Sequence, residues 1–270
     1  MVKYFPIVGL CLLLLITAIG NASEQEAYAF RRGERLSYKL NYGWFTIGRG
    51  SFQVDSGYYD FDGKHCYKVN ATGASSGLLK MVAPIDDEWG AYLRVGDLKP
   101  VHTYRNLREG RYQLQEKVFI DPDSGTIRVE SIKPHRKQIL RPTRNYMFDP
   151  ADKVNDILSG LLTIRNTDFS GLMPGDTIDL KAFLEDTFYD FKVVYAGKEE
   201  LKTKLGRLNA HKVVPLMPRN DIFDGERSMV AWLSDDRNKL PLKISARMFI
   251  GKASVEIVSY QNIKYGPDSH

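Results

Sequence analysis

The sequence predicts a mainly β protein: a curled antiparallel sheet, or a partly closed barrel or sandwich, with one amphipathic helix across it. Three observations support this fold class. Apolar and polar residues alternate along most of the chain, as in strands with one buried and one solvated face. Turn-forming stretches separate these segments, and a single segment has helical spacing instead. About a dozen candidate strands result, too many for a flat open sheet, so we expect the sheet to curl.

The alternation is clearest in two segments before the predicted helix and two after it. Residues 35–42 and 64–71 alternate first, and residues 178–185 and 242–248 alternate later, with Phe183 as the one exception. The stretches "DPDSG" (121–125), "MPGD" (173–176) and "SDDRN" (234–238) supply turn residues between strands. These segments are therefore expected to form antiparallel strands joined by tight turns.

One segment is predicted to be helical, over residues 150–165. Asp149 is a suitable N-cap, and Pro150 suits the first helical position. The apolar residues that then share one helical face are Val154, Ile157, Leu158, Leu161 and Leu162. We expect this face to lie on the sheet. Because no low-complexity linker interrupts the chain, residues 23–270 are read as a single β-rich domain.

Two similar glycine-containing stretches, "IGRGSFQV" (47–54) and "IGKASVEI" (250–257), raise the question of a phosphate-binding loop. Such a loop needs its glycines to open a helix, whereas both stretches continue with strand-like alternation. A nucleotide site is therefore rejected. Gly48 and Gly251 fall on the apolar side of these segments, where glycine marks a bend, a bulge, or a close approach of backbone or ligand.

The N-terminal residues 1–22 have the pattern of a cleaved signal peptide. Lys3 precedes an apolar run from Phe5 to Ile19, shorter than the roughly 20 residues of a membrane-spanning helix, and Ala22 ends a small-residue cleavage site. An uncleaved inner-membrane anchor is the alternative. We expect an exported protein, in the periplasm or at the inner face of the outer membrane. Cys66 would be the only cysteine of the processed chain, which excludes an intramolecular disulfide.

Motifs for catalysis, metal binding and cofactors are not found. The five histidines are scattered without zinc-ligand spacing, and a net charge of +5 is no nucleic-acid signature. Two carboxylate groups could do acid–base chemistry on a glycan. Asp235 and Asp236, however, are placed in a hairpin turn, and Asp86–Glu88 at a solvated strand end. The sequence therefore favours a non-catalytic protein without metal or cofactor.

Two groups of residues are candidates for ligand binding. Aromatic residues surround the first glycine stretch, and together with both glycines and the helix they are expected to line an apolar cavity: Tyr42, Trp44, Phe45, Gly48, Phe52, Gly251, Leu158 and Leu162. Ordinary sheet core is the alternative. A basic segment is expected to meet anionic lipid headgroups at a membrane surface through Lys133, Arg136, Lys137, Arg141 and Arg144, the alternative being a solvated loop.

Four stretches together resemble a bacterial exported family known as domain of unknown function 3108. They are "RRGERLSYKLNYGWFTIGRGSF", "DILSGLLTIR", "VVYAGKEELKTKLGRLNAHKVVP" and "AWLSDDRNKLPLKISARMFIGKAS". The resemblance implies an envelope-associated β-rich protein and brings no activity or catalytic residue. A distant likeness in architecture alone is to the lipoprotein-localisation factors, which are curled sheets with helices across an apolar concavity.

The sequence thus favours an envelope protein that binds a lipid-like or acyl-chain ligand in an apolar concavity, without catalysing a reaction. Two alternatives stay open: a periplasmic hydrolase that uses the paired carboxylates, and an interaction scaffold for another envelope protein.

Overall fold

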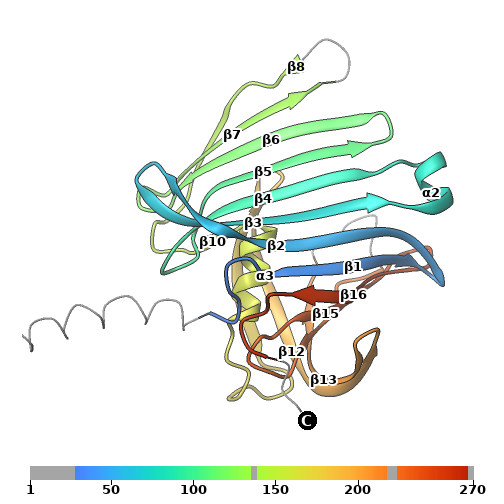
Figure 1. The fold of residues 1–270 in the computed structure, drawn as a ribbon. Helices are drawn as coiled ribbons and strands as arrows, with labels where there is room; N and C mark the ends of the chain where they lie inside the picture. Colours follow the sequence, from blue (N-terminus) through green and yellow to red (C-terminus); the bar gives the residue numbers. More distant parts are fainter. Residues whose placement is uncertain (1–27, 135–138, 218–223, 267–270) are drawn as a thin grey trace, which may run out of the picture.

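The protein is built on one long antiparallel sheet, shown in Figure 1. The computed structural model describes residues 28–134, 139–217 and 224–266. The strands are β1 (Arg35–Tyr42), β2 (Phe45–Phe61), β3 (Lys64–Ser75), β4 (Asp86–Arg94), β5 (Pro100–Glu109), β6 (Tyr112–Asp121), β7 (Thr126–Lys133), β8 (Ile139–Leu140), β9 (Arg144–Met147), β10 (Val154–Asn155), β11 (Thr177–Leu184), β12 (Thr187–Thr203), β13 (Gly206–Pro215), β14 (Met229–Ser234), β15 (Pro241–Arg247) and β16 (Lys252–Gln261). Two helices accompany them, α2 (Gly77–Val82) and α3 (Ile157–Arg165).

The sheet consists of two runs of neighbouring strands that meet in its centre. One run leads from β1 to β8 and the other from β10 to β16, and they join where β1 pairs with β16. Arg35 lies opposite Gln261 in this pairing. Every pairing is antiparallel except the short parallel contact between β10 and β11, and β9 lies beside β7. The mainly β, antiparallel fold predicted from the alternation is confirmed.

The sheet curls until its two ends face each other, and among the described residues no strand pairing joins these two ends. Strands β7 and β9 at one end contact β10 and β11 at the other through an apolar cluster that includes Val129, Val154 and Phe183. The rings of Tyr146 and Phe183 lie 5.0 Å apart across this junction. We call this junction the seam. The fold is therefore a partly closed barrel whose seam is held by side chains.

Helix α3 lies inside the curl and forms part of its core (Figure 1). Leu158 and Leu162 are buried against Leu36, Phe52 and other residues of the β1–β4 wall. At the end of the helix, the fully buried Arg165 pairs with the fully buried Glu34. The predicted position of this helix, with its apolar face against the sheet, is confirmed.

The predicted limits of this helix were wrong at the N-terminal side. Asp149 accepts a hydrogen bond from the backbone of Ala151 in a turn, and Val154 pairs with β11 as part of β10. The helix begins at Ile157, and its N-cap is Asp156, whose side chain accepts from Ser159 N at 2.9 Å while Ser159 Oγ accepts from Asp156 N. This reciprocal capping box defines the start better than Asp149 does.

The short helix α2 in the β3–β4 connection was not predicted. It spans six residues and has no side-chain hydrogen bond at its N-cap. A single apolar turn of this kind is too short to show helical periodicity, so no sequence pattern marked it.

The two glycines of the repeated stretch have different roles. Gly48 is a buried residue of β2, and a Cβ atom there would stand 2.6 Å from the carbonyl oxygen of Ala74. This confirms the close backbone approach expected at Gly48. Gly251, by contrast, is exposed in the turn before β16 and has a φ of +77°. Its predicted place on the apolar side of a strand was wrong, because the strand begins only at Lys252.

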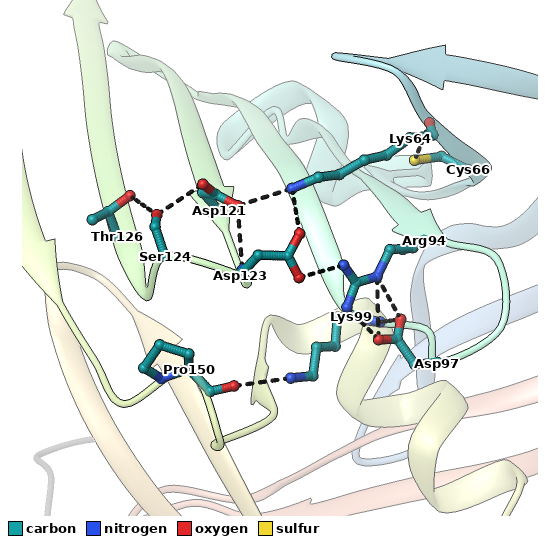
Figure 2. A network of polar contacts seen from close by, with 10 residues as sticks. All are labelled: Lys64, Cys66, Arg94, Asp97, Lys99, Asp121, Asp123, Ser124, Thr126 and Pro150. Carbon is teal, nitrogen blue, oxygen red and sulfur yellow. Dashed lines mark hydrogen bonds and ion pairs between the residues drawn. The ribbon is translucent and has the colours of Figure 1, made fainter.

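At one end of the sheet, the turns are tied together by ion pairs (Figure 2). Lys64 Nζ lies 2.8 Å from Asp121 Oδ1 and 3.1 Å from Asp123 Oδ2, and Arg94 bridges Asp123 and Asp97. The Lys64 ammonium holds the pKa of the Asp121 carboxyl at about 2. This end, which we call the polar end, thus joins the β2–β3, β4–β5 and β6–β7 turns.

The predicted signal peptide, residues 1–22, lies outside the described residues. Among the residues that are described, none belongs to a helix long and apolar enough to cross a membrane.

Candidate ligand-binding site

The concave side of the sheet contains two apolar pockets that adjoin at the start of α3. Both are lined by Trp89 of β4 and by Ile157 and Leu158 of α3. The first pocket, of about 420 Å³, lies between α3 and strands β1 to β4, and we call it the glycine pocket. The second, of about 320 Å³, lies between α3, strands β4 to β7 and the β11–β12 hairpin at the seam, and we call it the seam pocket.

The glycine pocket owes its volume to glycines in its wall. Gly48, Gly50 and Gly73 all line it, and Gly50 lies directly opposite Gly73 in the β2–β3 ladder. Two facing residues without side chains leave a gap on the inner face of the sheet. A Cβ atom at Gly73 would stand 3.8 Å from the Trp89 ring, so this position looks into the pocket rather than into backbone. The sequence identified Gly48 and missed Gly50 and Gly73.

Helix α3 supplies the floor between the two pockets. Leu158 lines both pockets, as the sequence predicted for the cavity. Leu162 is fully buried in the core below them and lines neither pocket. Ile157, which the predicted helical face placed on the sheet, is 59% exposed and points into the space that the pockets share. An apolar side chain exposed inside a concavity is available to a ligand.

Charged side chains form one wall of the seam pocket. Arg105 Nε lies 2.9 Å from Glu116 Oε1, and Arg105 also reaches Glu185 at 3.0 Å. Arg144 bridges Glu116 at 3.4 Å and Asp186 at 2.8 Å. We call these five residues the seam cluster. Arg105 of β5 lies directly opposite Glu116 of β6, which faces Ser131 of β7. Arg144 of β9 faces Val129, two residues from Ser131 and therefore on the same side of the sheet.

The seam cluster holds two guanidinium groups and three carboxylates. Burial opposes the charge of Arg105, but Glu116 and Glu185 outweigh it and raise the pKa of the Arg105 guanidinium. Both arginines therefore stay cationic, and the formal charges of the cluster, two basic against three acidic residues, sum to −1. Asp186 Oδ1 and Arg144 Nε are both buried without a well-formed hydrogen bond to a described residue, and the nearby Asp186 carboxylate, after burial, raises the pKa of the Tyr146 hydroxyl. A ligand group that donates a hydrogen bond would satisfy Asp186 Oδ1.

Besides Leu162, four of the eight predicted cavity residues lie outside both pockets. Trp44 and Phe45 are 96% and 76% exposed at the β1–β2 turn, so their placement in the interior was wrong. Tyr42 ends β1, and its hydroxyl donates to the carbonyl of Ile250. Gly251 packs against Tyr42 in the neighbouring turn. The turn at Gly43 and Trp44 ends the alternation, and the sequence pattern alone did not place it. Phe52, in contrast, lines the glycine pocket.

The basic segment does not form one free cationic patch. Arg144 is engaged in the seam cluster and not in an exposed basic surface, and its contact with membrane headgroups stays a prediction. The Lys133 ammonium lies over the ring of Tyr112 at 5.5 Å, and Arg141 is exposed. Arg136 and Lys137 lie outside the described residues.

The acidic clusters are occupied by structural contacts. Asp235 pairs with His211 at 2.9 Å and with Lys198 at 2.8 Å, and Asp236 accepts from backbone amides of the β14–β15 turn. The predicted hairpin turn is thus confirmed.

Asp86, Asp87 and Glu88 begin β4, as predicted, and each has its own partner. The predicted solvation holds for Asp86 but is wrong for Asp87, which is buried. Asp86 pairs with Arg108, Asp87 accepts from the Arg108 amide, and Glu88 accepts from Asn106. Among the described residues, no group of three or more histidine, cysteine or acidic side chains is arranged to hold a metal ion.

Comparison with known proteins identifies a matching family and a solved structure of similar fold. The family model described as "Protein of unknown function (DUF3108)" matches residues 37–258. A β-barrel-like protein of the domain of unknown function DUF1849 from Brucella abortus has a similar structure, with a TM-score of 0.56 and 10% identity, covering 87% of this chain and 100% of that one. No curated protein matches the chain.

Two further solved structures are more distant. A candidate exported protein of YmcC-like fold from Bacteroides fragilis has a TM-score of 0.36 and 9% identity, covering 87% of this chain and 99% of its own. A candidate lipoprotein from Parabacteroides distasonis has a TM-score of 0.33 and 10% identity, with the same coverages. Of the three, only the structural likeness to the Brucella protein supports the barrel-like fold, and a shared fold does not assign a function.

Proposed function

This chain belongs to the DUF3108 family, and we propose that it is a non-catalytic cell-envelope protein that binds an amphipathic, lipid-like ligand in the concave face of its curled sheet. The glycine pocket would hold the apolar part of the ligand and the seam pocket its polar end. The N-terminal signal-peptide pattern supports export, and we place the protein in the periplasm or at the inner face of the outer membrane.

The observation that carries this proposal is that the two pockets adjoin and share three lining residues. Trp89, Ile157 and Leu158 line both of them, so an extended molecule could pass from one to the other over the start of α3. Their volumes of about 420 and 320 Å³ fall in the range of small-molecule sites, roughly 300–1,000 Å³. Such sites combine a mostly apolar lining with a few placed polar groups, which here are the seam cluster.

The seam cluster also limits the chemistry of the ligand's polar end. Both arginines are already paired with carboxylates, and the cluster as a whole is slightly negative. A purely anionic headgroup would have to displace these carboxylates. A neutral or zwitterionic group with hydrogen-bond donors suits the buried Asp186 Oδ1 better. We therefore propose a ligand such as a monoacyl lipid with a zwitterionic head.

The non-catalytic part of the proposal rests on the engagement of the acidic residues. Asp235, Asp236 and the Asp86–Glu88 group each hold a turn or a neighbouring strand. A general acid needs a carboxyl that faces its substrate. The hydrolase alternative would require these structural contacts to be broken first.

The test is displacement of a fluorescent apolar probe, N-phenylnaphthylamine, by lysophosphatidylethanolamine. The wild-type protein should bind the probe and release it to the lipid. In Gly73→Leu the new side chain enters the glycine pocket beside Trp89, and we expect affinity to fall by roughly tenfold or more. The matched control is Gly57→Leu, on β2 outside both pockets, which should bind as the wild type does. Absence of wild-type binding, or equal losses in the two variants, would refute the proposal.

A further inference from the structure

Large apolar side chains are exposed together at one end of the sheet. Of the eight such residues that are more than 60% exposed in the described part of the chain, six lie on three connections between neighbouring strands. They are Trp44 and Phe45 at the β1–β2 turn, Met81 and Val82 in α2, and Phe249 and Ile250 at the β15–β16 turn. We call these six residues the apolar rim.

The three connections lie next to each other because of the strand order. Strands β16, β1, β2 and β3 are consecutive in the sheet, so their turns alternate between its two ends, and these connections share one end (Figure 1). Specific contacts tie them together: Tyr42 Oη donates to Ile250 O, and Ser76 N donates to Ile47 O at 2.8 Å. The six side chains therefore belong to one surface.

Basic residues border the apolar rim. Arg49, Lys80 and Lys252 are exposed beside the three connections, and Arg111 lies on the adjacent β5–β6 turn. None of these four forms an ion pair with a described residue.

The remaining charges at this end largely cancel. Arg108 pairs with Asp86, and Arg247 pairs with Asp224. Glu109 is the remaining described acidic residue on the β5–β6 turn, and burial together with Asp87 raises the pKa of its carboxyl. The rim is thus apolar at its tips and positive around them.

The polar end of the sheet has the opposite character. There, lysine and arginine side chains are paired with aspartates that link one turn to the next (Figure 2). Such pairing occupies these charges, although Met147 on β9 stays exposed at this end. The two ends of the same sheet therefore differ: ion pairs between turns predominate at one, and exposed apolar side chains at the other.

We infer that the apolar rim inserts into the surface of a lipid bilayer that contains anionic lipids. Tryptophan, phenylalanine and methionine side chains enter the boundary between headgroups and acyl chains, while lysine and arginine meet anionic headgroups. The tips project from three separate connections, which suits a fluid lipid surface better than a protein surface of fixed shape.

The rim also lies at the mouth of the glycine pocket. Ile47, beside the β1–β2 turn, and Leu79 of α2 both line that pocket, as does Ile85 after α2. Docking of the rim would therefore place the pocket against the acyl layer, so that a lipid could enter from the bilayer. This orientation rests on the proposed function, whereas docking itself does not.

The docking test is flotation of the full processed chain with vesicles of phosphatidylcholine alone or with phosphatidylglycerol. We expect the wild type to float with the anionic vesicles and to be released by high salt. The double variant Trp44→Ser/Phe45→Ser should bind them at least roughly tenfold more weakly. The matched control Met147→Ser removes an equally exposed side chain on β9 at the polar end and should bind like the wild type.

Two further variants test how much the basic residues around the rim contribute to vesicle binding. Lys80→Glu/Lys252→Glu should lose binding to anionic vesicles, whereas Lys204→Glu, in the β12–β13 turn away from the rim, should retain it. Absence of wild-type flotation with either vesicle, or flotation that the rim variants leave unchanged, would overturn the inference. Self-association that Trp44→Ser/Phe45→Ser abolishes would assign the rim to a second copy and would overturn it as well.

Gly73→Leu separates this inference from the proposed function. The substitution fills the glycine pocket and leaves the rim intact, so it should float like the wild type while it loses the probe. If the pocket proposal fails and flotation persists, the rim still docks on lipid. If flotation fails and probe binding persists, only the membrane inference is lost.

Discussion

Arg165 and Glu34 form a two-point ion pair in the closed interior of the curled sheet. Arg165 Nη1 lies 2.6 Å from Glu34 Oε1, Arg165 Nη2 lies 3.2 Å from Glu34 Oε2, and neither side chain is exposed. Arg165 Nη2 also donates to the carbonyl oxygens of Ala29 and Asn238. The last residue of α3 is thereby fixed to the segment before β1 and to the β14–β15 turn, so α3 is anchored at its C-terminal end.

We expect Arg165→Met to lower the free energy of unfolding by about 3–5 kcal/mol, because it leaves the Glu34 carboxylate buried without a partner. The double variant Glu34→Leu/Arg165→Met removes both charges and should recover most of this loss. Urea unfolding monitored by circular dichroism gives both values. The control is Arg207→Met, which breaks an exposed pair with Glu200 and should cost about 0–1 kcal/mol. A double variant as unstable as Arg165→Met would contradict this account.

Two glycines that line the glycine pocket, Gly48 on β2 and Gly73 on β3, should respond in opposite ways to alanine. Gly48→Ala places its methyl group 2.6 Å from the Ala74 oxygen, so we expect about 1–3 kcal/mol of destabilisation. Gly73→Ala meets only an ordinary contact with Trp89 and should stabilise by about 0.5–1 kcal/mol, since glycine is unfavourable in a strand. The measurement is the urea midpoint of each variant, and equal effects would show that the close approach at Gly48 is not a constraint.

His102 should make the protein less stable as the pH falls below about 6.5. Burial, with Lys117 nearby, lowers the pKa of the His102 imidazole, although Val118 O and Glu130 act in the opposite direction. The unfolded state then binds the proton at a higher pH than the folded state does, so the free energy of unfolding decreases as pH drops from about 6.5 through the folded pKa.

The variant that isolates this effect is His102→Phe, whose ring can keep the stacking on Phe61 and Phe119. Its free energy of unfolding should fall less steeply between pH 6.5 and pH 5 than that of the wild type. The variant should still lose some stability as the pH falls, because burial also lowers the pKa of His211, which it retains. Identical slopes in the two proteins would rule out His102 as a source.

Cys66 should resist thiol reagents in the folded protein. Its side chain is fully buried in β3, and burial raises the pKa of the thiol to about 11. At pH 8 we expect 5,5′-dithiobis(2-nitrobenzoic acid) to react at least roughly a hundredfold more slowly than with free cysteine. Denaturant should restore the full rate. Rapid labelling of the native protein would instead mean that β3 opens readily at this position.

Local patterns predicted the strands and turns well, because alternation and turn chemistry depend on near neighbours. The segment 35–42 forms β1 with the predicted limits, and the turns at 121–125 and 234–238 join strands as expected. The start of α3 could not be predicted in this way. Asp149 and Asp156 are both acceptable N-caps, and the choice is made by the pairing of Val154 with Lys181 in β11, a contact distant in sequence.

The candidate site was predicted only where it coincides with a strand or helix pattern. Gly48, Phe52 and Leu158 were identified because their elements were placed correctly. Trp44 and Phe45 were assigned to the interior because apolar residues usually are buried, yet they occupy the β1–β2 turn. The seam cluster depends on which ends of the sheet meet, and no local pattern in the sequence contains that information.

The pairing of β1 with β16 has a consequence for how the chain folds. The middle of the sheet joins Arg35 to Gln261, whereas the strands on either side of it pair mostly with their neighbours in sequence. Each run of strands can therefore form early, starting from its hairpins. The edges of β1 and β16, however, stay unpaired until β16 has been synthesised and meets β1. Closing so long a loop is entropically costly and slow. Joining β1 to β16 is thus the step in which the half-formed sheet stands most exposed to aggregation, and a chaperone that shields these two edges would assist it most.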